Sequence, residues 1–257
     1  MTAEVSISAV MGVPDIKPGD DLAGILGDCL QAHAGGPQDG DIICVAHKVF
    51  SKAEGNIIRP ADVIPSAEAI ALGEQLNKDP RKVEVILQQS ARVVKFWKRP
   101  TQEHGTLICE HKLGFTAANA AVDESNAEED ATVITLPDNP DKSADALRKQ
   151  LESRFSKRLG VVMTDTFGRP WRLGQVNVAI GLSMVPATTS EIGNTDAWGR
   201  TLDVTEPAFA DEISAASGLV VRKAAKTPMV LFRGLEWTTE PGSSAQDILR
   251  KKEENMF

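Results

Sequence analysis

Residues 159–175 read LGVVMTDTFGRPWRLGQ, an apolar run up to Met163 that passes into a polar, glycine-punctuated stretch. A short apolar run of this kind is typical of a buried β-strand. Behind it, Asp165 offers hard oxygen donors for a cation, while Arg169 and Arg172 offer guanidinium groups for phosphate. Ligands bind at strand ends in mixed α/β proteins, so we expect residues 164–175 to be a binding loop at the end of a buried strand.

A second acidic loop is expected at residues 122–126, which read Val-Asp-Glu-Ser-Asn. Asp123 and Asp165 could share a divalent cation if the fold brings the two loops together, and Thr166 adds a hydroxyl group. This donor set suits magnesium or manganese rather than zinc, and such a cation would need a phosphate to hold. The spacing alone leaves an alternative open, in which Asp165 caps a turn and Asp123 is solvated.

Four cationic residues follow predicted strands. Lys48 and Lys52 come just after the apolar strand 41–46, and Arg169 and Arg172 come after the run that ends at Met163. Arginine binds phosphate oxygens by bidentate hydrogen bonds and lysine binds them as a point charge. Their shared placement favours a phosphate site, whereas each residue alone is compatible with an ordinary surface ion pair.

The composition limits the class of protein. The chain has 257 residues, 42% hydrophobic and 25% charged, which suits one globular domain with or without a smaller lobe. The net charge of -8 argues against nonspecific binding of nucleic acid or anionic membranes. No apolar run is long enough to span a bilayer and no leader is visible, so we expect a cytoplasmic protein. The three cysteines are expected to be reduced thiols: Cys29, Cys44 and Cys109.

The residue patterns predict alternating strands and helices. Strands are expected at 5–10, 41–46, 106–110 and 228–232. Helices are expected over 20–31, from Asp79-Pro80 to about Lys95, along 147–155 and over 211–216, and the polar residues 51–55 predict a turn. This order indicates a mixed-sheet α/β (α+β) fold. The chain lacks a Walker-type loop, a Gly-x-Gly-x-x-Gly fingerprint and a Gly-x-Ser-x-Gly elbow, which argues against the P-loop and Rossmann classes.

These motifs together resemble the coenzyme F420-0:L-glutamate ligase family, the gamma-glutamyl ligases of deazaflavin coenzyme biosynthesis. The likeness keeps the family's order along nearly the whole chain. It includes residues 12–14, 19–22, 49–55, 79–81, 113–115, 119–120, 122–126, 164–181, 196–199, 211–213 and 233–235. The resemblance implies an α/β fold outside the common nucleotide-binding classes, and an intertwined homodimer.

The resemblance also implies a reaction. The terminal carboxylate of coenzyme F420-0 would be phosphorylated by GTP, and the amine of L-glutamate would attack the resulting acyl phosphate. Two divalent cations, Mg²⁺ or Mn²⁺, would be needed, because cations bridging phosphates neutralise charge that develops during the transfer. Two alternatives remain open: a paralogue that joins an amino acid to a different carboxylate, and a non-catalytic relative that binds GTP.

The expected site residues fall into three groups, of which the resemblance implies the first two, the cation ligands and the nucleotide contacts. One cation would bind Asp123 and Asp165, and the second would bind Thr166. The nucleotide would contact Gly12, Val13, Pro14, Asp15, His47, Lys48, Lys52, Asn126, Val221, Arg222, Lys223, Ala224, Ala225, Lys226, Thr227 and Pro228. The residues expected to act in the reaction itself are Asp165, Arg169, Arg172 and Lys52.

The sequence departs from the family's pattern at three places. Ala121 stands where relatives usually have glycine. Arg222 and Lys223 lie where many archaeal relatives carry glycine and an acidic or amide residue that binds the second cation, and a protonated lysine cannot replace that ligand. Residues 184–190 also differ from the usual sequence, so the reaction type is better specified than the acceptor.

Overall fold

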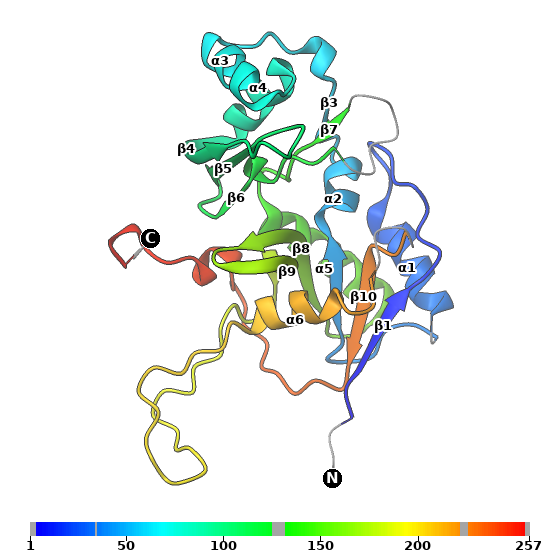
Figure 1. The fold of residues 1–257 in the computed structure, drawn as a ribbon. Coiled ribbons are helices and arrows are strands. Elements are labelled where there is room, and N and C mark those ends of the chain that lie inside the picture. The colour runs from blue at the N-terminus through cyan, green and yellow to red at the C-terminus, as the bar shows by residue number, and fades with distance from the viewer. Residues whose placement is uncertain (1–3, 34, 125–131, 222–225, 255–257) are drawn as a thin grey trace.

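A mixed five-stranded β-sheet forms the centre of the molecule (Figure 1). The structure is a computed structural model that describes residues 4–33, 35–124, 132–221 and 226–254. The strand order is β1–β10–β2–β8–β9, with β1 at Ser6–Val10, β10 at Met229–Arg233, β2 at Ile42–Ala46, β8 at Gly160–Arg169 and β9 at Arg172–Ser183. Only β2 and β8 pair in parallel, and the other neighbours are antiparallel. The predicted mixed sheet is therefore confirmed.

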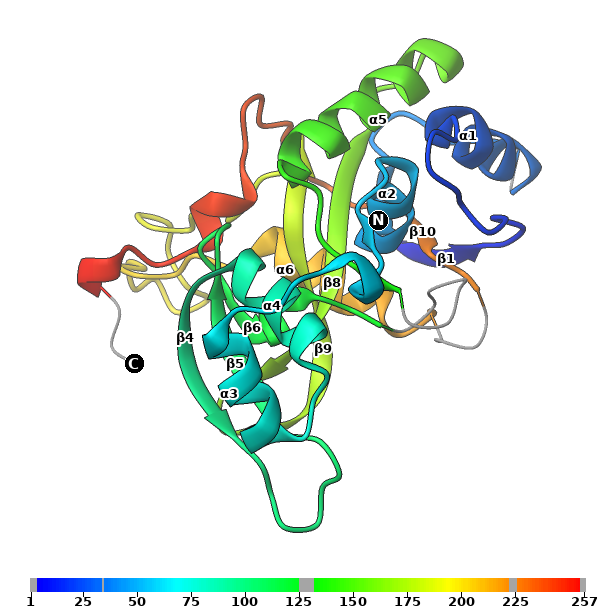
Figure 2. The ribbon, with the colours of Figure 1, turned by 90° about the horizontal axis from the view of Figure 1, so that it is seen from above.

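Helices cover both faces of this sheet (Figure 2). One face carries α1 (Leu22–Ala32), α2 (His47–Ala53) and α5 (Pro140–Phe155), and the other carries α6 (Phe209–Ser217). Within β2, Ile43 and Val45 pack into the first core and Ile42 and Cys44 into the second. Burying each large aliphatic side chain stabilises the fold by about 1.5–3 kcal/mol. A strand buried on both faces explains why this segment is a continuous apolar run.

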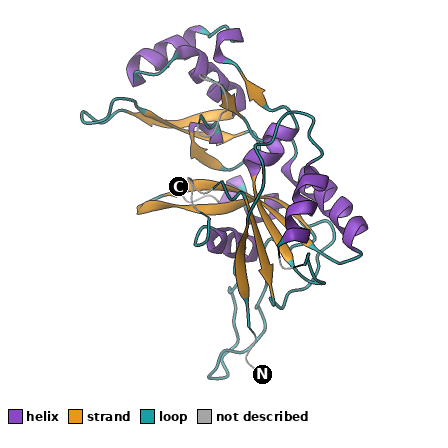
Figure 3. Cartoon of the chain, turned by 90° about the vertical axis from the view of Figure 1, so that its right-hand side faces the viewer, coloured by secondary structure: helices purple, strands orange, loops and turns teal. Residues whose placement is uncertain are grey.

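A smaller antiparallel sheet lies above the end of the β8–β9 hairpin (Figure 3). It contains β4 (Ser90–Trp97), β5 (Thr106–His111) and β6 (Thr116–Ala118), and it is covered by α3 (Ala67–Leu76) and α4 (Pro80–Gln89). These elements share a separate cluster of buried side chains that includes Leu76, Val83 and Leu107. The short strands β3 (Ile57–Ile58) and β7 (Val133–Ile134) pair beside it, and short 3-10 turns occupy Pro60–Asp62, Asn119–Ala121, Ala245–Ile248 and Lys252–Glu254.

The predicted strands at 5–10, 41–46, 106–110 and 228–232 are confirmed as β1, β2, β5 and β10. Cys44 and Cys109 are buried, and all three cysteines are free thiols. Burial raises the pKa of the Cys44 thiol to about 12, against hydrogen bonds from Ser217 and Thr164 that lower it, so this thiol is not a nucleophile. In the described ranges, no helix has the length and apolar character that crossing a membrane requires.

The helix predicted from Asp79-Pro80 to about Lys95 is wrong in its second half. The helix begins as predicted, with the Asp79 carboxylate accepting from the Arg81 N–H, but it ends at Gln89. The next eight residues form β4, which pairs with β5 across two register shifts. Apolar residues at helical spacing continue into this strand, and only the pairing with a distant segment decides its conformation.

Two predicted loops are also wrong over part of their length. Residues 164–169 continue β8, which turns at Pro170 and Trp171 into β9, so the expected binding loop is a β-hairpin. Of the turn predicted over residues 51–55, residues 51–53 belong to α2, and only residues 54 and 55 form a turn. In both places polar residues that predicted a loop lie in regular structure.

Strand direction determines where the site forms. Since β1 and β2 are both antiparallel to β10, the carboxyl ends of β1, β2 and the first half of β8 meet the start of β10 at one edge of the sheet. The second half of β8 extends beyond β2, because the β2–β8 pairing ends at Ala46 and Thr164. This leaves one edge of β8 open beside the start of α2.

Candidate nucleotide and metal site

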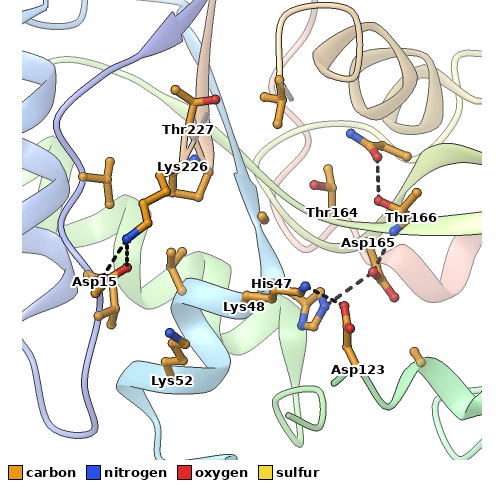
Figure 4. Close-up of a pocket in the computed structure, with 18 of the residues that line it drawn as sticks. Asp15, His47, Lys48, Lys52, Asp123, Thr164, Asp165, Thr166, Lys226 and Thr227 are labelled. Atoms are coloured by element: carbon orange, nitrogen blue, oxygen red, sulfur yellow. Dashed lines mark hydrogen bonds and ion pairs between the residues drawn. The ribbon is translucent and has the colours of Figure 1, made fainter. Parts of the chain in front are cut away.

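A cavity of about 390 Å³ lies at this edge of the sheet, a volume within the range of small-ligand sites. It is lined by residues 13–16, 46–49, 52, 118, 119, 121–123, 164–166, 175, 177, 221 and 226–228. Segments far apart in the sequence thus meet around one space (Figure 4). The two acidic segments expected to share a cation, around Asp123 and Asp165, both line it.

Asp123 is held in place by backbone and side-chain contacts. Its backbone exchanges two hydrogen bonds with Ile134 of β7, of 3.0 and 2.8 Å. Its carboxylate Oδ2 lies 2.6 Å from Nζ of Lys48, the second residue of α2. The two side chains are 18% and 29% exposed, so this ion pair is only partly screened by solvent. Lys48 therefore neutralises the Asp123 carboxylate, which the sequence predicts to bind a divalent cation.

Asp165 meets the residue before Lys48. Its Oδ1 lies 3.4 Å from Nε2 of His47, and His47 Nδ1 lies 3.3 Å from the Ser51 hydroxyl. His47 is fully buried and its Nε2 has no hydrogen-bond partner among the described residues. The order serine, histidine and aspartate is that of a nucleophilic triad, but Ser51 is completely buried and does not line the cavity. We therefore assign this row to holding Asp165 rather than to nucleophilic attack.

Thr166 sits on the adjacent strand position and faces Asn177 of β9. Its backbone N–H donates to Asp165 Oδ1 at 2.6 Å, and its hydroxyl donates to Asn177 Oδ1 at 2.9 Å. The Asn177 amide in turn donates to the Ser217 hydroxyl of α6 at 3.0 Å. Because the Thr166 proton is directed to Asn177, the lone pairs of its oxygen remain for a cation.

The donor set fits a hard divalent cation only in part. Two carboxylates and one hydroxyl are oxygen ligands of the kind that Mg²⁺ and Mn²⁺ prefer. Among the described residues, no group of three or more histidine, cysteine, aspartate or glutamate side chains could hold a metal ion. Lys223, expected near the second cation, lies outside the described residues, as do Asn126, Arg222, Ala224 and Ala225. A cation here would need further oxygens from a bound phosphate.

Two more lysines line the cavity away from Asp123 and Asp165. Lys52 is 7% exposed at the end of α2, and Lys226 Nζ lies 3.0 Å from the Asp15 carboxylate. The hydrogen bond from Lys226 holds the pKa of Asp15 below its usual value. The segments of Val13, Pro14 and Asp15 and of Lys226, Thr227 and Pro228 thus face each other across the cavity. Val221, another predicted nucleotide contact, also lines the cavity. Gly12 does not line it, although the next residue, Val13, does.

The two arginines expected to bind phosphate are not part of this cavity. Arg169 and Arg172 pair with each other at the tip of the β8–β9 hairpin, and Arg169 donates to the backbone oxygen of Leu173 at 3.2 Å. The structure therefore brings the predicted lysines and aspartates together and leaves these two arginines outside. It adds Asn119 and Asn177, which the residue patterns did not single out as site residues. Gln175, the last residue of the segment 164–175 expected to bind a ligand, also lines the cavity. Asn177 could only be found by knowing that β9 pairs with Thr166.

Acidic oxygens facing lysine ammonium groups at the strand ends of a mixed α/β sheet are typical of proteins that bind phosphorylated ligands together with divalent cations. The comparison with known proteins narrows this class. The chain belongs to the F420-0:Gamma-glutamyl ligase family, whose pattern it matches over residues 11–234.

Several relatives match almost the whole chain. Identity is 36% over 255 residues to the Coenzyme F420:L-glutamate ligase of Methanothermobacter thermautotrophicus, covering 98% of each chain. The protein of the same name from Methanocaldococcus jannaschii is 41% identical over 221 residues, covering 86% of this chain and 85% of its own. The one from Methanopyrus kandleri is 39% identical over 246 residues, covering 94% and 93%.

Proposed function

We propose that this chain is a coenzyme F420-0:L-glutamate ligase that uses GTP. The observation that carries the proposal is the family match over 11–234, which includes both acidic segments and the lysines around one cavity. The relatives at 36–41% identity carry the name Coenzyme F420:L-glutamate ligase. The activity therefore belongs to coenzyme F420 biosynthesis, and its product is a new amide bond.

The reaction has two transfers. A carboxylate oxygen of F420-0 attacks the γ-phosphorus of GTP, GDP leaves, and an acyl phosphate forms. The glutamate amine then attacks the acyl carbon and inorganic phosphate leaves, while the amine loses its protons to solvent or a base. Both steps place negative charge on phosphate oxygens, so catalysis depends on preorganised positive charge.

The residues of this chain supply that environment. Lys48, Lys52 and Lys226 line the cavity and are the ammonium groups for the phosphate oxygens. Asp123 and Asp165 with the Thr166 hydroxyl would hold divalent cations, which would neutralise the transferring phosphate. His47, buried between Ser51 and Asp165, keeps the Asp165 carboxylate oriented. The roles expected for Gly12, Arg169 and Arg172 remain part of the proposal, with the arginines acting from the hairpin tip.

We also propose a homodimer. Large apolar side chains are exposed on the hairpin tip and on the long segment before α6, and such exposure is typical of contact surfaces. Leu173 is 98% exposed, and Trp198 and Val204 are 84% and 86% exposed. Light scattering on the purified protein measures the oligomeric state, and a monomer at micromolar concentration would contradict the dimer without affecting the ligase proposal.

The test is a product assay. The protein is incubated with GTP, Mn²⁺, L-glutamate and F420-0, and products are identified by mass spectrometry. One glutamyl residue added to F420-0 with stoichiometric GDP is the expected result. In Asp165→Asn, which keeps the shape of the side chain, turnover should fall roughly 100-fold or more while the thermal midpoint stays close to wild type. GDP release only with another carboxylate would indicate the paralogue, and GTP binding without any turnover would indicate a non-catalytic relative.

A further inference from the structure

Lys78 is a half-buried cation beside the cavity that the site described above does not use. It lies between α3 and α4, and its Nζ donates to the side-chain oxygen of Asn119 at 3.3 Å. No carboxylate of the described residues forms an ion pair with it, whereas its neighbour Lys82 pairs with Glu124 at 2.5 Å. Burial lowers the pKa of Lys78, against the attraction of Glu124, which raises it. A partly buried cation whose hydrogen bond goes to a neutral amide rather than to a carboxylate is costly to the fold, which points to a use in binding.

Asn119 connects this lysine to the cavity. An ammonium group can only donate, so the amide oxygen of Asn119 must face Lys78 and its Nδ2 group is left as a donor. No described residue accepts a hydrogen bond from this Nδ2, and Asn119 lines the cavity. The side chain thus presents a donor to a ligand with a positive charge directly behind it.

The backbone at this point is unusual. Asn119, Ala120 and Ala121 have φ values of 53°, 48° and 53°, three consecutive residues in the left-handed region. Alanine in this region costs about 1–2 kcal/mol per residue, and such conformations concentrate at binding sites. The turn ends two residues before Asp123, so it places Asn119 and the predicted cation ligand on one short segment of the cavity wall.

We propose that Asn119 and Lys78 bind a carboxylate of the incoming amino acid. This rests on the proposed ligase function and names the part of the site that receives glutamate. The reacting carboxylate of the acceptor has to lie among the phosphate and the cations, near Asp123 and Asp165. Glutamate brings two further carboxylates besides its amine. The lysines at the phosphate end are engaged with Asp123 and Asp15 or directed to the nucleotide, and Lys78 supplies separate positive charge for the amino acid.

The experiment compares steady-state kinetics of wild type, Lys78→Met, Lys78→Arg and Asn119→Asp with GTP, Mn²⁺, F420-0 and varied L-glutamate. Lys82→Met is the matched control, since it removes a nearby lysine that already has a carboxylate partner. Loss of a charge-assisted contact should raise the KM for glutamate about 10- to 100-fold in Lys78→Met. The KM for F420-0 and the dissociation constant for GDP, measured by calorimetry, should change less than about twofold.

The variants separate binding from a structural role. Lys78→Arg keeps the charge and should recover most of the glutamate affinity. Asn119→Asp still accepts from Lys78 but places a negative charge toward the amino acid, so its KM for glutamate should rise as well. An unchanged glutamate KM in folded Lys78→Met, or an equal loss of F420-0 or GDP affinity, would overturn the assignment. Failure of the wild type to make any glutamylated product would instead overturn the proposed function.

Discussion

Replacing Lys48 with methionine should make the enzyme bind a divalent cation more tightly when no nucleotide is present. In the structure the Lys48 ammonium already occupies the position beside the Asp123 carboxylate, at 2.6 Å. A cation that takes this carboxylate must first displace the ammonium, because two positive groups cannot share it closely. In the wild type a phosphate bound in the same cavity would give the displaced lysine another acceptor.

The size of the effect follows from the exposure of the pair. With the side chains 18% and 29% exposed, the contact is neither fully screened nor fully buried. A charge-assisted hydrogen bond in such a setting contributes about 1–2 kcal/mol. Its removal should therefore raise Mn²⁺ affinity about 5- to 30-fold in Lys48→Met. The same variant should bind GDP more weakly, since it has lost a phosphate contact.

Mn²⁺ titration followed by the electron paramagnetic resonance signal of free Mn²⁺ measures this directly, at low ionic strength and without nucleotide. Lys226→Met is the matched control, because Lys226 also pairs with an aspartate in the cavity, Asp15 at 3.0 Å, but away from Asp123. It should lower GDP affinity and leave Mn²⁺ affinity unchanged. Equal or weaker Mn²⁺ binding by correctly folded Lys48→Met would refute the competition between lysine and cation.

Two further predictions concern stability. A methyl group at Gly181 would lie 2.7 Å from backbone atoms of Pro140, so Gly181→Ala should lower the free energy of unfolding by about 1–3 kcal/mol or more. Gly168→Ala is the control, because the added atom meets nothing within 4 Å, and it should change the free energy of unfolding by less than about 0.5 kcal/mol. Urea denaturation measures both. Burial lowers the pKa of His111 to about 4 from 6.5, so the unfolded chain binds a proton that the folded chain does not between these pH values. Stability should therefore fall by up to about 3 kcal/mol as the pH drops through this window, and His111→Phe should flatten the dependence; an identical pH slope in the variant would exclude His111 as its source.

The elements that could be predicted from the sequence are those that a short stretch of residues specifies by itself, through an apolar run or a capping residue. The run at 41–46 is apolar because β2 is covered on both faces, and the Asp79-Pro80 start signal acts through local capping. The second half of the predicted helix to Lys95 and the expected loop at 164–175 failed for one reason. The end of the predicted helix becomes β4 by pairing with β5, and residues 164–175 form a hairpin in which β8 pairs with β9, the next strand along the chain. In both segments strand pairing overrides the local residue pattern.

The candidate site likewise contains residues that the sequence could predict and residues that it could not. Asp123, Asp165 and the lysines could be proposed from residue type and position after strands, and the structure places them around one cavity. Asn119 and Asn177 could not, because their orientation depends on Lys78 and on Thr166 across the hairpin. Arginine next to glycine suggested a phosphate loop, yet the hairpin carries these guanidinium groups away from the cavity.

The site depends on how α2 begins. Asp165 belongs to the central sheet, whereas Asp123 is anchored through Ile134 to the β3–β7 ladder, so nothing in either element alone sets the distance between their carboxylates. His47 and Lys48, consecutive residues at the start of α2, contact one carboxylate each. Since α2 follows β2 without a linker, the position of β2 in the sheet fixes the positions of His47 and Lys48. A change that shifts the start of α2 should therefore disturb Asp123 and Asp165 together, even though neither residue is altered.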